Sequence, residues 1–249
     1  MEKEKKGIFV FNNKDKSPWN TLEDSKATYG INRGFRRGSK ICVCGVPSSG
    51  KTNTIFNILT RDPEHPFDKI WVLQFEGSEE YDSLYCDKIH KYEELPTSNE
   101  IDKTQKQLFI FEDLDEIPKQ DKSILDRYMR FLSSHIGLSV ILVVQNFCSL
   151  PISLRRKCDV FVISKTALNQ ALDYVREISK EDKLKLKEYM KDKGRFDFVS
   201  IDLCAVDKYR FNLDTIIDMS KIKIIAPEGY MKDNKKKVIL ESESEDDCP

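Results

Sequence analysis

Residues 45–52 read Gly-Val-Pro-Ser-Ser-Gly-Lys-Thr, and they combine the residue types that bind phosphate groups. The segment fits the spacing G-x-x-x-x-G-K-[ST] in full. Glycines let the backbone turn tightly, so that its N–H groups and the N-terminus of the next helix can surround phosphate oxygens. The ammonium of Lys51 would reach the β- and γ-phosphates, and the Thr52 hydroxyl would bind Mg²⁺. The predicted nucleotide-binding residues are Gly45, Val46, Pro47, Ser48, Ser49, Gly50, Lys51, Thr52 and Asn53.

Two carboxylates follow an apolar run in the segment Leu-Phe-Ile-Phe-Glu-Asp-Leu-Asp-Glu, residues 108–116. One of Glu112 and Asp113 should hold Mg²⁺, directly or through water, and the other should orient and deprotonate the attacking water. Position alone favours Glu112 for the metal and Asp113 for the water. Asp115 and Glu116 are alternative candidates for these roles, but they are better interpreted as the solvated start of a helix. The predicted metal ligands are Thr52, Glu112 and Asp113.

Polar residues also follow the next apolar run along the chain. Gln145 comes directly after it, where its amide could contact both the γ-phosphate and the attacking water, or merely satisfy a turn. Arg155 and Arg156 come shortly afterwards, and either could supply positive charge to the leaving phosphate, within one subunit or across a ring interface. A basic loop that contacts solvent or DNA is the alternative. The predicted catalytic residues are Lys51, Glu112, Asp113, Gln145 and Arg155.

Five short apolar runs predict the strands that position these residues. They are β-branched or aromatic and nearly free of polar residues, as strands buried on both faces of a parallel sheet are. The runs are residues 41–44, 70–73, 108–111, 140–144 and 160–163. Helical patterns occupy residues 50–60, 79–90, 119–135 and 166–193. This alternation predicts an α/β fold with a doubly wound, mainly parallel central sheet flanked by helices.

The ends of the chain depart from this pattern. Residues 195–213 alternate with a period of two and predict a C-terminal β-hairpin. We therefore divide the chain into an N-terminal arm (1–37), a P-loop core (38–213) and a C-terminal extension (214–249). The extension carries a basic segment and then an acidic tail, which we expect to be disordered.

Composition excludes several classes of protein. The chain has 249 residues, of which 39% are hydrophobic and 33% charged, as expected of a soluble globular protein. No apolar run is long enough for a membrane span, and the first ten residues do not resemble a secretory signal. The seven cysteines lack zinc-site spacing and suit buried thiols in a reducing compartment. Without the five acids of the last nine residues the chain holds 41 basic and 37 acidic residues, a mildly basic body that permits a nucleic-acid partner without requiring one.

Several tracts, taken in order, resemble the poxvirus-type genome-packaging ATPases of the FtsK–HerA branch of P-loop ATPases. Related enzymes occur in other large DNA viruses and in virophages. The resemblance covers roughly residues 38–213, and its most discriminating part is the strand-ending glutamine followed by leucine, proline and arginine. The tracts are GVPSSGKT, KIWVLQFEGSEEYDSL, LFIFEDL, VVQNFCSLPISLRRKCDVFV and RFDFVSIDLCAVDKYRFNL.

The resemblance implies a RecA-like core and an Mg²⁺-dependent ATPase that drives double-stranded DNA into a preformed capsid. It also implies a homo-oligomeric ring, a pentamer or hexamer, that works with capsid or portal-like vertex components in a viral factory of the host cytoplasm, and possibly in the virion. Lys51 and Thr52 match the Walker A pair, Glu112 and Asp113 the Walker B acids, Gln145 the sensor glutamine, and Arg155 the arginine after the Leu-Pro turn. The chain departs from the family pattern in having Ser48-Ser49 before Gly50 and a glutamate first in its acidic pair.

Two other functions keep the same nucleotide site. One is a nucleotide-gated binding or scaffold module that hydrolyses slowly, if at all. The other is a different nucleic-acid-dependent ATPase, such as a replication helicase. Turnover discriminates the first of these, because a motor assembled on DNA should reach about 1 s⁻¹ or more.

Overall fold

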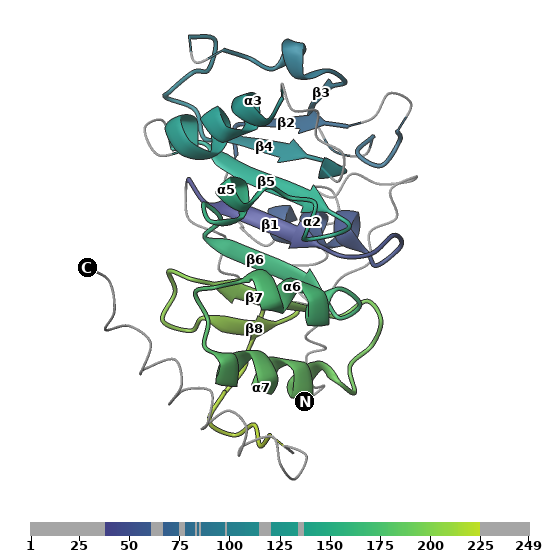
Figure 1. The fold of residues 1–249 in the computed structure, drawn as a ribbon. Coiled ribbons are helices and arrows are strands. Elements are labelled where there is room, and N and C mark those ends of the chain that lie inside the picture. Colours follow the sequence, from purple (N-terminus) through teal and green to yellow (C-terminus); the bar gives the residue numbers. More distant parts are fainter. Residues whose placement is uncertain are drawn as a thin grey trace, which may run out of the picture.

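The structure is a computed structural model that describes residues 38–60, 67–74, 78–82, 84, 86–97, 99–114, 121–133 and 137–224. Within these residues, nine strands form one sheet in the order β3-β2-β4-β5-β1-β6-β7-β8-β9 (Figure 1). The strands from β3 to β6 in this order are parallel, and β7, β8 and β9 are antiparallel. Their bounds are β1 Lys40–Cys44, β2 Lys69–Leu73, β3 Asp87–Ile89, β4 Gln107–Phe111, β5 Ser139–Val144, β6 Val160–Ser164, β7 Phe198–Asp202, β8 Tyr209–Phe211 and β9 Thr215–Ile216.

The central strands are buried on both faces, because helices or loops pack on each side of the sheet. In β1, Ile41 and Val43 belong to one hydrophobic cluster, and Cys42 and Cys44 belong to the other. The same alternation runs through β4 and β5. Successive side chains of a strand point to opposite faces, so an uninterrupted apolar run is what a strand in the middle layer needs.

Helices pack on both faces of the sheet. In the view of Figure 1, α3, α5, α6 and α7 lie in front of the sheet and α2 lies behind it. The helical segments are α2 Lys51–Thr60, η1 Tyr92–Glu94, α3 Lys122–Arg127, a π-helical continuation η3 Tyr128–Leu132, α5 Ile152–Arg155, α6 Leu168–Tyr174 and α7 Lys180–Met190. The α/β class and the doubly wound, mainly parallel sheet predicted from the sequence are therefore confirmed.

The five predicted strands and the helix at 50–60 are confirmed as β1, β2, β4, β5, β6 and α2. The helix predicted at 119–135 is present as α3 and η3 over the part of that range that the structure describes. The helix predicted at 79–90 is wrong. Residues 79–82 contain turns, and β3 occupies Asp87–Ile89 as a parallel neighbour of β2. The apolar residues that suggested a helix there are buried individually: Tyr81 packs edge-on against Phe56 of α2, and Ile89 lies in the opposite cluster.

The helix predicted at 166–193 is two helices. The apolar residues that recur at helical spacing in this segment, among them Ala171, Val175 and Ile178, are all buried. The break comes at Val175, whose backbone is extended, and Ser179 then begins α7 by accepting a hydrogen bond from the backbone N–H of Asp182 at 3.0 Å. The break allows α7 to turn and pack near the antiparallel end of the sheet, as Figure 1 shows.

The C-terminal hairpin is confirmed as β7 and β8, which continue the sheet antiparallel to β6. A third antiparallel strand, β9, lies just after residue 213, where the sequence placed the end of the core. The predicted arm at 1–37 and the acidic tail lie outside the described residues. In the described part of the chain, none of the helices is both long and apolar enough to cross a membrane.

Candidate active site

The loop of residues 45–50 connects β1 to α2 at the edge where the parallel strands end. Its first residue extends the ladder between β1 and β5, because the Gly45 N–H donates to the Val144 carbonyl at 3.1 Å. Ser48 and Gly50 then adopt left-handed backbone conformations, with φ of 58° and 88°. Such a sequence of backbone turns directs successive N–H groups to one side of the loop. The loop therefore has the local geometry that the sequence motif predicts.

Gly45 is needed for a different reason from Gly50. Its φ is not left-handed, but a Cβ at this position would lie 2.3 Å from Ser49 Oγ and 2.8 Å from Ser164 Oγ. Both distances are shorter than real Cβ atoms show, so a side chain here would require Ser49 and Ser164 to shift. A Cβ at Gly50 would make only ordinary contacts, 3.8 Å from a ring carbon of Phe196 and 4.0 Å from one of Phe198, so the left-handed φ explains this glycine.

An open cavity of about 360 Å³ lies in front of this loop. Its walls come from four parts of the chain that are distant in sequence: the loop and start of α2, the 78–82 turn, the end of β4 and the end of β5. The lining residues are Pro47, Ser48, Gly50, Lys51, Thr52, Asn53, Glu80, Glu112, Asp113 and Gln145. Of the predicted nucleotide-binding residues, Gly45, Val46 and Ser49 do not line the cavity but build the loop behind it.

Glu112 lies at the end of β4, where its side chain accepts a hydrogen bond from the Tyr81 hydroxyl. Burial raises the pKa of Glu112 to about 7, and the nearby carboxylates of Glu80 and Asp113 add to the rise, while Tyr81 and Lys51 oppose it. Burial, together with the Glu112 charge, also raises the pKa of Tyr81 well above its ordinary value, so the tyrosine stays a donor. A buried carboxyl that titrates near neutrality in a cleft is typical of a functional site.

Asp113 points toward the end of β5. Its Oδ1 accepts a hydrogen bond from Gln145 Nε2 at 3.1 Å, which joins the predicted acidic pair to the predicted sensor. Asp113 has a left-handed φ of 46°, a conformation that non-glycine residues rarely adopt. Strained backbone of this kind is found where a side chain must be aimed at a particular position.

Glu80 is the functional candidate that sequence reasoning missed. Its Oε2 accepts a hydrogen bond from Thr52 Oγ1 at 3.2 Å, and its carboxylate is among the charges that raise the pKa of Glu112. The interpretation of 79–90 as a helix gave Glu80 no role in the site. No motif in the sequence connects it with the P-loop, because only folding brings the turn to the start of α2.

The cavity suits a nucleoside triphosphate with Mg²⁺ better than it suits a protein-only metal centre. In the residues that the structure describes, no group of three His, Cys, Asp or Glu side chains could hold a metal. Mg²⁺ usually takes one or two protein ligands together with phosphate oxygens and water, and Thr52 with Glu112 or Asp113 offers such a set. The buried Ser49 Oγ, for which the described residues supply no hydrogen-bond partner, also lies in this loop. The residues present therefore fit Mg²⁺ delivered with its nucleotide.

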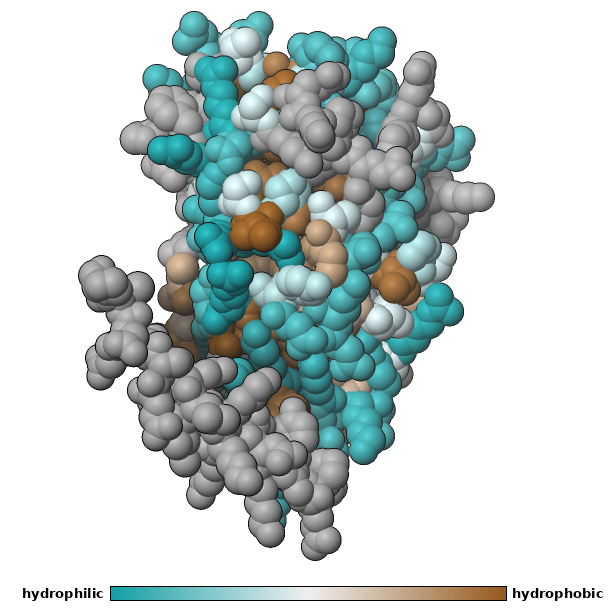
Figure 2. Space-filling model, viewed as in Figure 1, coloured by the Kyte–Doolittle hydropathy of each residue, from teal (hydrophilic) through white to brown (hydrophobic). Residues whose placement is uncertain are grey.

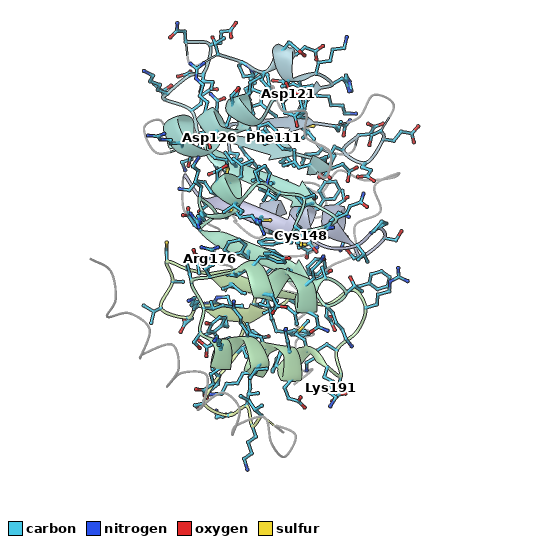
Figure 3. The ribbon with its side chains drawn as sticks, viewed as in Figure 1. Phe111, Asp121, Asp126, Cys148, Arg176 and Lys191 are labelled. Atoms are coloured by element: carbon cyan, nitrogen blue, oxygen red, sulfur yellow. The ribbon has the colours of Figure 1, made fainter. Side chains whose placement is uncertain are left out.

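Arg155 is not brought into this cavity within one chain. Its guanidinium lies 4.8 Å from the centroid of the Tyr174 ring and lines a separate pocket beside α5 and α6. The arrowheads of β1, β5 and β6 point to the right of Figure 1, toward the P-loop, whereas Arg176 of the arginine-lined pocket is labelled at the left of Figure 3. Within one chain, Arg155 therefore lines a different pocket from the one that contains the P-loop.

Comparisons with known proteins give structural relatives alone. No family model and no curated protein sequence matches the chain. Among solved structures, the chain is similar to B204, the DNA-packaging ATPase from Sulfolobus turreted icosahedral virus, with a TM-score of 0.53 and 12% identity over 71% of this chain and 98% of B204. It is also similar to the genome-packaging NTPase B204 of Sulfolobus turreted icosahedral virus 2 bound to sulfate (TM-score 0.54, 16% identity, 74% and 100% covered) and bound to AMPPCP (0.53, 14%, 72% and 98%). The chain therefore has the P-loop NTPase fold that these viral packaging enzymes share.

Proposed function

We propose that this protein binds and hydrolyses ATP at the P-loop cavity. The observation that carries the proposal is the convergence of one lysine, one hydroxyl, two carboxylates and one amide on a single cavity at the ends of β1, β4 and β5. These are the groups that phosphoryl transfer to water requires, and they come from residues up to 94 positions apart in the sequence. They are Lys51, Thr52, Glu112, Asp113 and Gln145.

Each side chain has a role that its surroundings support. Lys51 forms no ion pair with any described carboxylate, so its charge is available to the β- and γ-phosphates. Thr52 and Glu112 would hold Mg²⁺, which when bound neutralises charge on the phosphates. Asp113, held by Gln145, would orient the attacking water and accept its proton. The Asp113–Gln145 hydrogen bond also makes the amide responsive to changes around the γ-phosphate.

We further propose that hydrolysis drives double-stranded DNA into a preformed capsid. The support is the fold shared with B204, together with the family-like order of the glutamine, the Leu-Pro turn and the arginine at residues 145–155. On this proposal the working form is a homo-oligomeric ring, with Arg155 acting on the nucleotide of a neighbouring copy. Capsid or portal-like vertex components would be its partners, in a viral factory of the host cytoplasm.

The decisive experiment measures ATP hydrolysis with and without long duplex DNA, alongside the native mass of the particle. We expect an assembled ring, Mg²⁺-dependent turnover of about 1 s⁻¹ or more, and stimulation that depends on duplex length. Turnover far slower than this, indifferent to DNA, would favour the nucleotide-gated binding module. Displacement of one strand from a forked duplex would favour a helicase. Unchanged hydrolysis in a Lys51→Ala variant would reject the assigned cavity altogether.

A further inference from the structure

A second pocket, which we call the arginine pocket, opens beside α5 and α6 on the face of the sheet opposite to α2. It encloses about 120 Å³ and is lined by the side chains of Arg155, Arg156 and Arg176. The Arg155 guanidinium lies over the rings of Tyr174, at 4.8 Å, and Phe147, at 5.6 Å, and these contacts fix its orientation. Three guanidinium groups are thus gathered around one small hollow.

The arginines of this pocket form no ion pair in the described structure. Arg210 is paired with Asp207 at 3.4 Å, whereas Arg155, Arg156 and Arg176 have no carboxylate within 4.0 Å in the part of the chain that the structure describes. Glu177 also lines the pocket but stays beyond that distance. The Nε of Arg155 is buried, and the described residues offer it no hydrogen-bond acceptor. Because an unsatisfied buried donor is costly, the pocket is suited to acceptors that arrive from elsewhere.

The wall of the arginine pocket is apolar. Ile152 is 52% exposed and Tyr174 is 45% exposed, both unusually high for large hydrophobic side chains in this molecule. Figure 2, which views this face, shows hydrophobic residues among hydrophilic ones in the middle of the molecule. A bare phosphate would satisfy the arginines but would leave the apolar wall in water. The ligand that fits both features carries an acidic part and an apolar part side by side.

One segment of the chain has this composition. Residues 238–247 read Val-Ile-Leu-Glu-Ser-Glu-Ser-Glu-Asp-Asp, three apolar residues followed directly by alternating and then consecutive acids. The segment lies outside the described residues. We propose that residues 238–247 bind in the arginine pocket of the same chain, with the apolar residues against Ile152 and Tyr174 and the carboxylates on the arginines.

The path of the chain allows this. The last described residues follow β9, and Ile222 packs against the same hydrophobic cluster that holds α6 and Leu154 of α5, so the chain leaves on the face that carries the arginine pocket. Three strand spacings separate β9 from β6, which is about 14 Å at ~4.8 Å per spacing. Residues 225–237 can span more than 40 Å at roughly 3.3 Å per residue, so the linker reaches with slack.

The test uses the full-length chain with its five tail acids replaced by amides: Glu241→Gln, Glu243→Gln, Glu245→Gln, Asp246→Asn and Asp247→Asn. A fluorescent peptide of residues 238–249 should bind this variant, as measured by anisotropy, and should bind the wild type about 10-fold more weakly because the native tail competes. Adding Arg156→Glu and Arg176→Glu to the tail variant should weaken binding about 10-fold or more, and binding should fall with added salt.

The matched control is Lys191→Glu with Arg195→Glu, an equal charge change at two exposed positions, of which Lys191 is labelled on the opposite side of Figure 3 from Arg176. It should leave peptide affinity within about 2-fold. Because reversed charges could disturb folding, Arg156→Gln with Arg176→Gln provides a milder pair that should still weaken binding. Equal peptide affinity in the pocket and control variants overturns the proposal. So does a pocket that binds labelled duplex DNA but not the peptide. A fall in native mass when the tail is neutralised would place the tail on a neighbouring copy and overturn the same-chain assignment.

Discussion

The P-loop cavity and the arginine pocket are both polar hollows on one sheet, but they are built differently. The P-loop cavity lies where the parallel strands end and is shaped by backbone, with left-handed turns at Ser48 and Gly50. Its side chains carry both signs of charge. The arginine pocket lies beside short helices and is lined by three arginines that form no ion pair with a described carboxylate, although Glu177 also lines it. Mixed charge suits a metal-bound triphosphate, whose own charges are mixed, whereas unpaired positive charge suits an acidic partner.

Burial separates the two regions further. The carboxyl of Glu112 is buried and its pKa is raised to about 7, so the P-loop cavity holds a group that is costly to ionise. Arg156 is exposed and stays hydrated until a partner covers it. The ionised carboxyl of the P-loop cavity therefore lowers the stability of the folded protein, whereas the charges of the arginine pocket contribute free energy only when a partner binds.

Lys51→Ala should have the largest effect, because Lys51 is the one cation among the described residues that line the P-loop cavity. We expect ATP hydrolysis to fall by about 100-fold or more, with weaker nucleotide binding. Steady-state phosphate release and titration with a fluorescent nucleotide measure the two losses. Lys191→Ala, at an exposed and distant lysine, is the control and should retain activity. If both variants lost activity equally, charge in general rather than this cavity would be responsible.

Glu112→Gln should stabilise the fold while impairing hydrolysis. The folded pKa of Glu112, about 7, lies above the ordinary value of 4.5, so the native state binds a proton that the unfolded chain releases between these pH values. The free energy of unfolding therefore falls as pH rises from about 4.5 to 7, by about 3 kcal/mol in total. Denaturant unfolding of the apoprotein should show Glu112→Gln more stable than wild type at pH 8 and similar to it at pH 4.5. An equal difference at both pH values would mean that the burial of this carboxyl carries no such cost.

Gly45→Ala tests whether close packing, rather than loop flexibility, shapes the P-loop cavity. The new Cβ would meet Ser49 Oγ and Ser164 Oγ, and we expect a loss of about 1–3 kcal/mol in the free energy of unfolding. Thermal unfolding measures it. Gly194→Ala gives a milder comparison, since its Cβ would first meet a carboxylate oxygen of Asp197 at 3.1 Å, at an exposed turn. A Gly45→Ala protein as stable as the Gly194→Ala protein would show that the loop can move away from β6.

Glu80→Gln should have the smallest effect, and it tests whether the Glu80 charge contributes to the raised pKa of Glu112. Removing the Glu80 charge removes one contribution that raises the pKa of Glu112. We expect that pKa to fall by less than about one unit, and the pH at which the unfolding stability stops falling to move down with it. Stability against pH for Glu80→Gln and for Glu79→Gln, an exposed neighbour, measures the difference. No displacement between the two profiles would remove Glu80 from the electrostatics of the site.

Much of the fold was predictable because strands buried on both faces appear in the sequence as short, uninterrupted apolar runs. Apolar runs such as residues 140–144 read as strands whichever neighbour they pair with, and the loop motif indicates where one strand meets a helix. The region of residues 79–90 was not predictable. Its apolar residues have helical spacing, but Tyr81 and Ile89 are buried in different clusters on opposite faces of the sheet. The spacing of apolar residues along the sequence does not predict on which face of the sheet each one is buried.

The sequence by itself determined the nucleotide loop, the parallel sheet and the positions of Glu112, Asp113 and Gln145 at strand ends, because local spacing and strand termini carry that information. Only the tertiary structure decided that Glu80 and Tyr81 reach Thr52 and Glu112, that Glu112 is buried enough to titrate near neutrality, and that Arg155 faces a different pocket. These properties depend on which segments become neighbours across the sheet. The burial of a charged group and its distance from other charges cannot be read from the order of residues, because both depend on the tertiary structure.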